Sequence, residues 1–321
     1  MLLALFHWCR SMSRCPLTYE VIPDGYYSLQ GLRRLNSRLT TLQPLAFTKE
    51  ELLEEAAERS AKISLEGVQP KVSAVLSVPE SAFMLTDVNG KFIIKPQQPV
   101  YNALPENEDL TMRLAGIAGI EVPQHGLIYD KTGSLHYFIK RFDRSGKSEK
   151  FAVEDFAQLS GKTRNTKYDS SMEKVAGIIE KYCTFPMIEK VKLFTITLFN
   201  YLTGNEDMHL KNFSLITKNN ITSLTPAYDL LNTTIVMKHA SEEIALPISG
   251  RKRNLSRKDF INYFAVERLG LNDRTIDSVI STLMRAIPVW EGEIAISFLS
   301  DGMKEDYTSL LHSRRNILGL R

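Results

Sequence analysis

Apolar side chains at every second position predict that the first half of the chain is rich in strands. Residues 72–78 show this alternation and favour a half-buried strand. Two further apolar runs, 81–87 and 91–96, flank Asn89 and Gly90. Because Asn-Gly suits a type I′ turn, these runs predict a β-hairpin and hence an antiparallel sheet.

Two more hairpins are predicted further along the chain. Residues 126–130 and 136–144 mix aromatic and β-branched side chains on either side of a glycine-containing turn. Residues 213–217 and 221–224 form a shorter pair around two asparagines.

Helical spacing predicts two early helices and a mostly helical chain from residue 153 onward. Thr48 and Glu51 form a capping box ahead of a short helix over 50–62. Asn107 is the predicted N-cap of an amphipathic helix over 107–119. Later helices are expected at residues 155–159, 170–183, 186–202, 256–269, 273–286, 289–299 and 303–318.

The pattern divides the chain into three segments. Residues 1–46 show no sustained period and are expected to be a loosely structured lead-in. Residues 47–143 hold most strand signals, whereas residues 144–321 open with a polar, basic connector and then turn helical. A length of 321 residues suits two domains or one two-lobed unit.

Composition narrows the class of protein. Forty basic against thirty-seven acidic residues give a formal charge of only +3, which makes no global case for binding nucleic acid or membrane. Three cysteines are too few and too scattered for a disulfide framework, and free thiols are favoured over zinc. Residues 1–8 lack a basic leader, and no apolar run approaches membrane-spanning length. We therefore expect a soluble protein of the reducing cytoplasm.

The candidate chemistry lies at residues 204–212 and 225–230. The first stretch places Asp207, His209, Lys211 and Asn212 within six residues, and Asp229 follows seventeen residues after Asn212. Phosphoryl transfer needs a carboxylate to orient the attacking hydroxyl, a cation to offset charge, and oxygen ligands for magnesium. Asp207, Lys211 and the pair Asn212 and Asp229 match these roles, with His209 among the catalytic candidates. The alternative is a polar loop that caps two helices.

Lys95 ends the second strand of the first predicted hairpin. A lysine there can reach nucleotide phosphates if a carboxylate fixes its direction, and Glu108 is the candidate carboxylate. The alternative for Lys95 is a surface lysine on an edge strand. The one basic cluster, residues 251–258, lacks interleaved aromatics, so a solvated loop is favoured over a nucleic-acid contact.

These motifs together resemble the HipA-like serine/threonine kinases. The resemblance covers about residues 60–320, and it rests on six motifs in the family's order. The motifs are GVQPK at 67–71, FIIKP with Lys95, Asn107-Glu108, FIKRFDR at 138–144, GNEDMHLKN at 204–212 and TPAYDLL at 225–231.

The resemblance implies an α+β, two-lobed protein-kinase-like fold with a small, mostly antiparallel β N-lobe over 47–143 and a larger all-helical C-lobe over 144–321. It implies ATP as substrate and Mg²⁺ as cofactor. Asp207 is then the catalytic base, Asn212 and Asp229 the metal ligands, and Lys95 the phosphate contact steered by Glu108. The remaining ATP-binding residues implied are Gly67, Val68, Gln69 and Lys71 over the phosphates, and Lys140 and Phe142 at the hinge.

The resemblance also implies the toxin of a bacterial toxin-antitoxin module that phosphorylates a translation component. The precedents are tryptophanyl- and glutamyl-tRNA synthetase, both aminoacyl-tRNA synthetases. Only about sixty residues precede the glycine loop, whereas full-length HipA toxins carry an extra subdomain of roughly a hundred. The chain therefore resembles the shorter HipT type, with a HipS-like small protein and a HipB-like DNA-binding antitoxin as partners, and with DNA reached only through the antitoxin.

Ser64 lies three residues before Gly67, where the family is similar in having an autophosphorylated serine, and Ser60 is a second candidate. A phosphate there adds nearly two negative charges beside the ATP loop and opposes nucleotide binding. The alternative for both is a serine at a helix end or turn.

Two other functions remain open at this point. A small-molecule or phosphoinositide kinase uses the same catalytic loop. A catalytically silent scaffold that binds an antitoxin and DNA belongs to another class, but it has no need of Asp207, Asn212 and Asp229 together.

Overall fold

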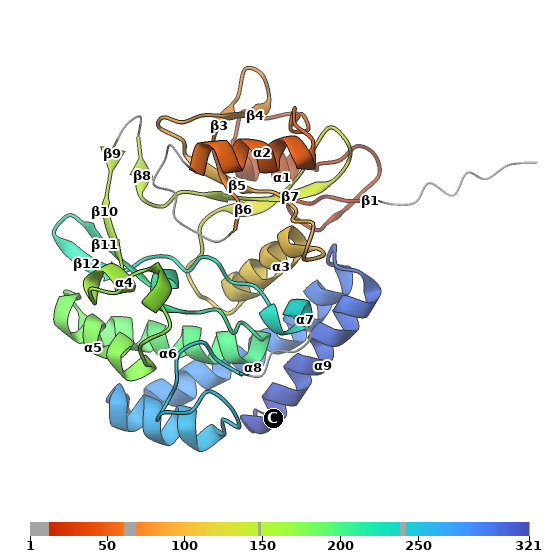
Figure 1. The fold of residues 1–321 in the computed structure, drawn as a ribbon. Helices are drawn as coiled ribbons and strands as arrows, with labels where there is room; N and C mark the ends of the chain where they lie inside the picture. The colour runs from red at the N-terminus through yellow and green to blue at the C-terminus, as the bar shows by residue number, and fades with distance from the viewer. Residues whose placement is uncertain (1–12, 61–68, 147–148, 238–241, 321) are drawn as a thin grey trace, which may run out of the picture.

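A five-stranded antiparallel sheet forms the upper part of the molecule, and helices form the lower part (Figure 1). The computed structural model describes residues 13–60, 69–146, 149–237 and 242–320. The strand order is β4-β3-β5-β7-β6. The strands are β3 (Val72–Ser77), β4 (Ala82–Leu85), β5 (Phe92–Lys95), β6 (His125–Tyr129) and β7 (Leu135–Lys140).

The strands flanking Asn89 and Gly90 do not pair with each other, so the first predicted hairpin is wrong. β3 lies between them, with Ala74 opposite Leu85 of β4 and opposite Phe92 of β5. Gly90 packs tightly against β3, because a Cβ added there would lie 1.8 Å from the Ser73 Oγ. An Asn-Gly signal marks a change of direction, but it does not decide which strand pairs across it.

The other two predicted hairpins are confirmed. β6 and β7 pair antiparallel around the turn at residues 131–133. β11 (Ser214–Lys218) pairs with β12 (Ile221–Leu224), and Asn219 and Asn220 both have positive φ, 49° and 62°. Two successive left-handed residues are what a type I′ turn requires.

The lead-in is not loose in its described part, residues 13–46. It forms β1 (Ser13–Arg14), β2 (Val21–Ile22) and α1 (Leu29–Leu35), and its apolar side chains share a core with the sheet. Leu32 and Leu35 of α1 and Leu52 and Ala56 of α2 (Lys49–Ser60) are buried in that core, and Figure 1 shows α2 between the labels of β3 and β5. These elements are too short to show a period in sequence. The capping box of α2 is confirmed, since Glu51 and Thr48 exchange hydrogen bonds of 2.7 and 3.2 Å.

α3 (Leu104–Ile117) lies under the sheet and belongs to the second, larger core with the other helices. Asn107 does not cap it, because α3 already begins at Leu104. The remaining helices are α4 (Phe156–Leu159), α5 (Met172–Tyr182), α6 (Pro186–Thr203), α7 (Thr233–Met237), α8 (Asp273–Ile296), α9 (Asp301–Ile317), the 3₁₀ turns η1 (Arg164–Thr166) and η2 (Leu210–Asn212), and the π-helix η3 (Asp259–Arg268).

α8 joins two predicted helices into one, with Pro288 inside it. Its buried face continues across the proline, through Ile287 and Trp290 to Ile294. The Trp290 Nε1 also donates to the carbonyl of Leu114 on α3 at 2.9 Å. Packing therefore outweighs the local cost of the proline.

The expectation of an all-helical second part is wrong, because five short strands lie at residues 144–145, 149–150, 152–155, 214–218 and 221–224. β10 (Ala152–Asp155), β11 and β12 form a three-stranded antiparallel sheet, and β8 (Arg144–Ser145) pairs with β9 (Glu149–Lys150). In this sheet Asp155 lies opposite Ser214. The strands therefore bring Asp155 beside the end of the predicted catalytic loop.

Surface and thiol features complete the fold. None of the described helices combines the length and apolar composition needed to cross a membrane. Cys15 and Cys183 are buried free thiols, whereas Cys9 lies outside the described residues.

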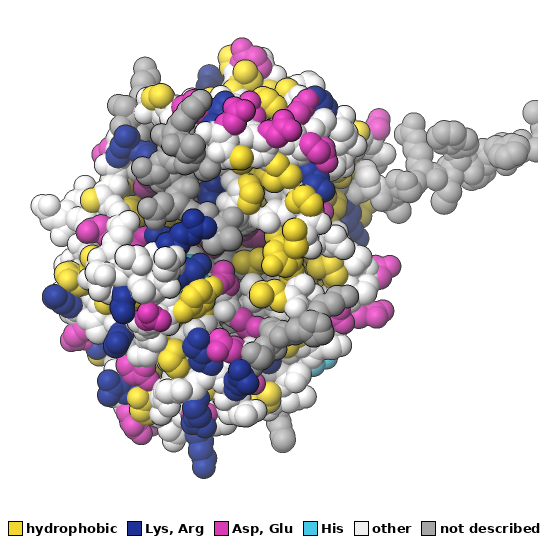
Figure 2. Space-filling model, viewed as in Figure 1, with side chains coloured by type: hydrophobic (Ala, Val, Ile, Leu, Met, Phe, Trp, Pro, Cys, Tyr) yellow, Lys and Arg dark blue, Asp and Glu magenta, His cyan; other side chains and the backbone are white. Residues whose placement is uncertain are grey.

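Within the basic segment at residues 251–258, Arg251 forms an ion pair with Asp259. Figure 2 shows charged side chains of both signs spread over the visible face, in keeping with the near-balanced composition.

Candidate active site

One cluster of ionic groups forms around Lys95, the last residue of β5. Its Nζ donates to Oε1 of Glu108, on α3, at 2.6 Å and to Oδ1 of Asp229, in the loop before α7. Only 6% of the Lys95 side chain and 1% of the Glu108 side chain are exposed. A strand end, a helix and a loop thus converge on a single buried cation.

Burial and pairing set the charges of this cluster. Burial lowers the pKa of Lys95, but Asp229 and Glu108 raise it further, so the net shift is upward. Burial raises the pKa of Asp229, but Lys95 and Lys71 outweigh burial and hold it at about 2. For Glu108 burial prevails over the pairing with Lys95, and its pKa is about 7. At neutral pH Lys95 and Asp229 are therefore charged, while Glu108 is near its midpoint.

The loop that carries Asp229 is tied to the helix that carries Glu108. Asp229 has a φ of 57°, in the left-handed region that Asp tolerates better than most residues. Three residues later, the amide of Asn232 donates to Oδ1 of Asn107 at 2.8 Å, and the Asn107 Nδ2 donates back to the Asn232 carbonyl at 2.9 Å. Since Asn107 precedes Glu108 on α3, this reciprocal pair fixes Asp229 relative to Glu108.

The catalytic-loop candidates follow directly from the end of α6. Gly204 closes that helix with a φ of 72°, a value that favours glycine. The Oδ1 of Asn205 then accepts a hydrogen bond from the backbone amide of Asp207 at 3.2 Å. The Nδ2 of Asn205 donates to the Asn200 Oδ1 at 3.1 Å. At the other end of the loop, the Asn212 Nδ2 donates to the Asp207 carbonyl at 2.8 Å. Side-chain amides therefore fix the loop at both ends.

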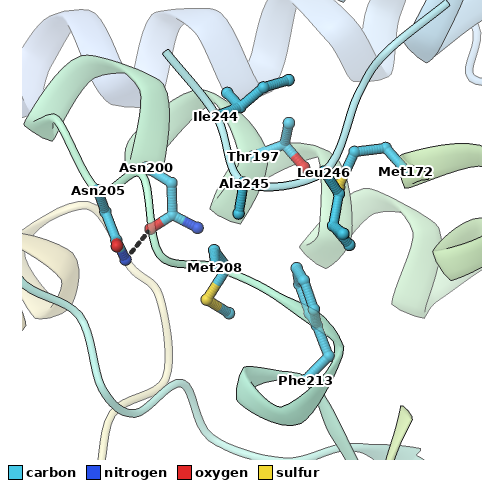
Figure 3. Close-up of a pocket in the computed structure, with 9 residues that line it drawn as sticks. All are labelled: Met172, Thr197, Asn200, Asn205, Met208, Phe213, Ile244, Ala245 and Leu246. Carbon is cyan, nitrogen blue, oxygen red and sulfur yellow. Dashed lines mark hydrogen bonds between the residues drawn. The ribbon is translucent and has the colours of Figure 1, made fainter. Parts of the chain in front are cut away.

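A small cavity lies behind this loop (Figure 3). Met208 points into it from the loop, facing Phe213 and, from other segments, Met172 and Leu246. Its volume of about 20 Å³ is enough for one water molecule and far too small for a nucleotide. The cavity thus belongs to the packing beneath the loop.

Asp207 itself is open to solvent, with 42% of its side chain exposed. The hydroxyl of Tyr168, from the segment after η1, donates to its Oδ1. His209 lies beside both, with Nε2 3.9 Å from the Asp207 Oδ1 and its ring edge-on to Tyr168 at 5.0 Å. Burial lowers the pKa of His209, so the imidazole is neutral at pH 7.

Lys211 reaches the strand beside the loop. Its Nζ lies 3.2 Å from the Asp155 Oδ2, and Asp155 is also the N-cap of α4. Tyr228, the neighbour of Asp229, donates its hydroxyl to the Lys211 carbonyl at 3.0 Å. This hydrogen bond connects the loop that carries Asp229 with the predicted catalytic loop.

The predicted hinge lies at the end of β7. The amide of Lys140 donates to the Gln124 carbonyl at 2.7 Å, so that amide is already engaged. The ring of Phe142 lies 5.5 Å from that of Tyr228. The side chain of Lys140 is exposed. Of the two hinge candidates, Phe142 is the one in contact with the rest of the site.

The glycine loop is described only at its end. Gln69 and Lys71 lead into β3, and burial lowers the pKa of Lys71 against the attraction of Asp229. Gly67, Val68 and Ser64 lie outside the described residues. Ser60 is the last residue of α2. Lys71 is thus brought to the Lys95 cluster.

The predicted metal ligands have suitable donor atoms. The Asn212 amide nitrogen is used by the Asp207 carbonyl, which leaves its oxygen for a cation. Asp229 is ionised and supplies carboxylate oxygen. Magnesium is bound by one or two such protein oxygens together with phosphates and waters. Within the described chain no cluster of three or more His, Cys, Asp or Glu side chains suits a metal.

Sequence reasoning missed three supporting residues. Tyr168 and Asp155 contact the catalytic loop from segments that carried no recognisable motif. Asn232 carries no motif of its own, and the sequence predicts a helix cap rather than a distant partner for Asn107. A polar Asn at a core-facing position of α3 is a signal for such a partner, since buried amides need hydrogen bonds.

Comparisons with known proteins identify the family and the fold. Residues 63–290 match the family described as HipA-like C-terminal domain. A "Putative kinase" of Haemophilus influenzae is 29% identical over 262 residues, which make up 77% of this chain and 74% of that protein. "Putative kinase Y4dM" of Sinorhizobium fredii is 32% identical over 265 residues, 76% of this chain and 63% of that protein.

Shewanella oneidensis HipA, named a serine/threonine-protein kinase toxin, is 25% identical over 73% of this chain and 58% of its own length. The solved complex of HipA, HipB and operator DNA from that organism matches with a TM-score of 0.67 and 21% identity, covering 88% of this chain and 73% of that chain. At this identity the match shows the fold alone, which is kinase-like. The matched segment 63–290 covers more than half of the chain, so the protein belongs to the family with a HipA-like C-terminal domain.

Proposed function

We propose that the chain is an ATP- and Mg²⁺-dependent protein serine/threonine kinase. The observation that carries the proposal is the convergence of Lys95, Glu108 and Asp229 beside a loop that presents Asp207 and Asn212. A polar loop that merely caps helices does not require a buried lysine bridging two acids. The names of the relatives support the same reaction class.

Each residue has a role that its surroundings allow. Asp207 is exposed and already accepts a hydroxyl hydrogen bond, so it is suited to orient an acceptor hydroxyl and take its proton. Lys95 supplies a fixed positive charge for the nucleotide phosphates, and Glu108 limits its direction. Asn212 and Asp229 would hold Mg²⁺, which neutralises phosphate charge when bound. Lys211 and His209 lie in the same loop as Asp207 and are the remaining proposed catalytic residues.

We further propose the two-lobed division at residue 143, with the sheet and α3 binding the nucleotide and the helical part binding the acceptor. Phe142 and Lys140 would form the hinge, and Gly67, Val68, Gln69 and Lys71 would cover the phosphates. These assignments rest on the resemblance of the motifs. The contact between Phe142 and Tyr228 supports the hinge.

The biological role that we propose is that of a toxin in a toxin-antitoxin module. The solved HipA is held in a complex with HipB and operator DNA, which supports a HipB-like antitoxin as partner here. By family analogy the acceptor is an aminoacyl-tRNA synthetase of the cytoplasm, and the chain is of the short HipT type with a HipS-like partner. Ser64, or Ser60, is the proposed site of autophosphorylation.

The test is intact mass with phosphosite mapping after incubation with ATP and magnesium. Wild type should gain phosphate at Ser64 or Ser60, and Asp207→Asn should lose transfer by a factor of about 10² to 10⁴ while still binding nucleotide. Asp277→Asn, an exposed acid on α8, is the matched control and should behave as wild type.

Two results would count against the proposal. A wild-type chain that binds no nucleotide is not a kinase and leaves the scaffold function. A chain that phosphorylates inositol lipids but neither itself nor a synthetase supports the phosphoinositide-kinase alternative.

A further inference from the structure

A chain of polar contacts holds the catalytic loop from behind. Glu206 directly precedes Asp207, and only 9% of its side chain is exposed. Its Oε1 accepts from the Thr234 Oγ1 at 2.7 Å and from the Arg314 Nη2 at 3.0 Å. The residue next to the proposed base is therefore anchored to α7 and, through Arg314, to α9.

Arg314 is itself fixed on several sides. Its side chain is only 7% exposed, and its Nη1 donates to the carbonyls of Tyr201 at 2.7 Å and Glu243 at 3.2 Å. The guanidinium also lies 4.9 Å from the centre of the Tyr201 ring. A buried arginine with this many fixed acceptors has little freedom, so it defines a position for the Glu206 carboxylate.

The start of the loop is held by α7 as well. The amide of Glu206 donates to the Thr233 Oγ1 at 2.8 Å, and the Thr234 amide donates to the Gly204 carbonyl at 3.2 Å. A Cβ on Gly204 would lie 2.4 Å from Leu310, on α9. The first residues of the loop are therefore held between α7 and α9 with no spare room.

We infer that Arg314 is a positioning residue for phosphoryl transfer, acting through Glu206 on the placement of Asp207. The inference rests on the proposed function, and it assigns a role to a helix that lies beyond residues 63–290, the segment matching the family. α9 then does more than complete the core. It sets the geometry of the loop that carries the base.

The experiment compares Arg314→Met with Arg315→Met in the full chain. Arg315 is the next residue of the same helix, and its Nε donates to the Leu320 carbonyl at 2.9 Å. A displacement of about 1 Å in a reacting group costs roughly 100-fold in rate, so Arg314→Met should lower kcat by about that factor. The nucleotide Kd should stay within about threefold of wild type, because Lys95 and Asp229 are untouched. Arg315→Met should change neither value.

Hydrogen exchange gives a second readout that does not depend on activity. Amides of residues 204–209 should exchange faster in Arg314→Met and at the wild-type rate in Arg315→Met.

If Arg314→Met does not fold, the same measurements are made on Glu206→Gln and Arg314→Lys. Glu206→Gln keeps an acceptor for Thr234 while removing the charge that pairs with Arg314. The double variant Glu206→Gln/Arg314→Met should lose little more than either single change, since both break one contact.

Three outcomes separate the possibilities. Equal loss of kcat in Arg314→Met and Arg315→Met overturns the inference. Parallel losses of kcat, nucleotide affinity and unfolding midpoint also overturn it, because they show general destabilisation. A wild-type chain that transfers no phosphate instead overturns the proposed function, and the exchange comparison would still show whether Arg314 orders the loop.

Discussion

The two halves of the candidate site are built in different ways. Around Lys95 two acids share one buried cation, and 6% of the Lys95 side chain, 1% of the Glu108 side chain and 31% of the Asp229 side chain are exposed. Around Asp207 the carboxylate of the proposed base is 42% exposed, and its loop is held by side-chain amides, by hydroxyls and by the ion pair between Glu206 and Arg314. The Lys95 half is a cluster of ionisable side chains paired with one another. The Asp207 half is a loop with an accessible carboxylate, held in place by its contacts with the helices behind it.

Under the proposed function, the difference follows from what each half would bind. A buried lysine is stable only with carboxylates beside it, so the Lys95 cluster is complete before any ligand arrives. The acceptor side has to admit a hydroxyl from another residue or molecule, so Asp207 stays accessible. Changes in the first half should therefore cost stability and activity together, whereas changes in the second should affect activity alone.

Lys95→Met should have the largest effect of the variants that test this contrast. It leaves Glu108 and Asp229 without their shared cation, and breaking a buried pair costs about 3 to 5 kcal/mol of folding free energy. ATP binding and phosphoryl transfer should both be lost. Chemical denaturation and calorimetric nucleotide titration measure the two effects.

Lys91→Met is the matched control for that variant. Lys91 lies just before the same strand, and its Nζ donates to the Gly146 carbonyl. The Lys91→Met variant should keep the wild-type free energy of unfolding and the wild-type nucleotide affinity. Full stability in Lys95→Met would show that the cluster does not hold the fold together, and the contrast drawn above would fail.

The pH dependence of Glu108 gives a second, smaller effect. Its pKa is about 7 in the folded chain against 4.5 ordinarily, so between these values the folded state holds an extra proton. Stability from this group is therefore present below about pH 4.5 and is lost as pH rises through 7. Activity should run the other way, because only ionised Glu108 orients Lys95. Between pH 6 and 7 the rate should rise about fivefold, as the ionised fraction of Glu108 does.

Glu106→Gln is the control for Glu108→Gln in that pH series. Burial also raises the pKa of Glu106 to about 7, but Glu106 has no ion pair with Lys95. Both variants should flatten the stability profile, whereas only Glu108→Gln should remove the acid limb of the rate profile. An unchanged acid limb in Glu108→Gln would assign that limb to another group.

The sequence predicted local structure best where a residue type favours one backbone conformation or forms hydrogen bonds with near neighbours. The hairpin at Asn219 and Asn220 was predictable because both residues suit a left-handed turn. The capping box at Thr48 was predictable because its two hydrogen bonds are local. The candidate residues Lys95, Glu108 and Asp229 were found as motifs, although nothing in the local pattern says that they meet.

The failures all involve partners distant in sequence. β3 lies between β4 and β5 because of sheet-wide pairing, which the turn at Asn89 does not encode. The segment at residues 13–46 is ordered by the apolar face of the sheet rather than by its own periodicity. Tyr168 reaches Asp207 from thirty-nine positions away, and no local pattern marks that contact.

Tyr168→Phe should have the smallest effect, and it tests the half of the site around Asp207. The Tyr168 hydroxyl donates to the Asp207 carboxylate, where an acceptor hydroxyl would have to bind. An exchangeable hydrogen bond is worth about 1 kcal/mol, so its removal should raise kcat/KM for a protein acceptor by roughly fivefold. Stability and nucleotide Kd should not change. Steady-state kinetics with varied acceptor measure the effect, and Tyr182→Phe, a distant exposed tyrosine, is the control. A fall in kcat would instead mean that Tyr168 holds Asp207 in place, and the acceptor side would then be preassembled like the Lys95 cluster.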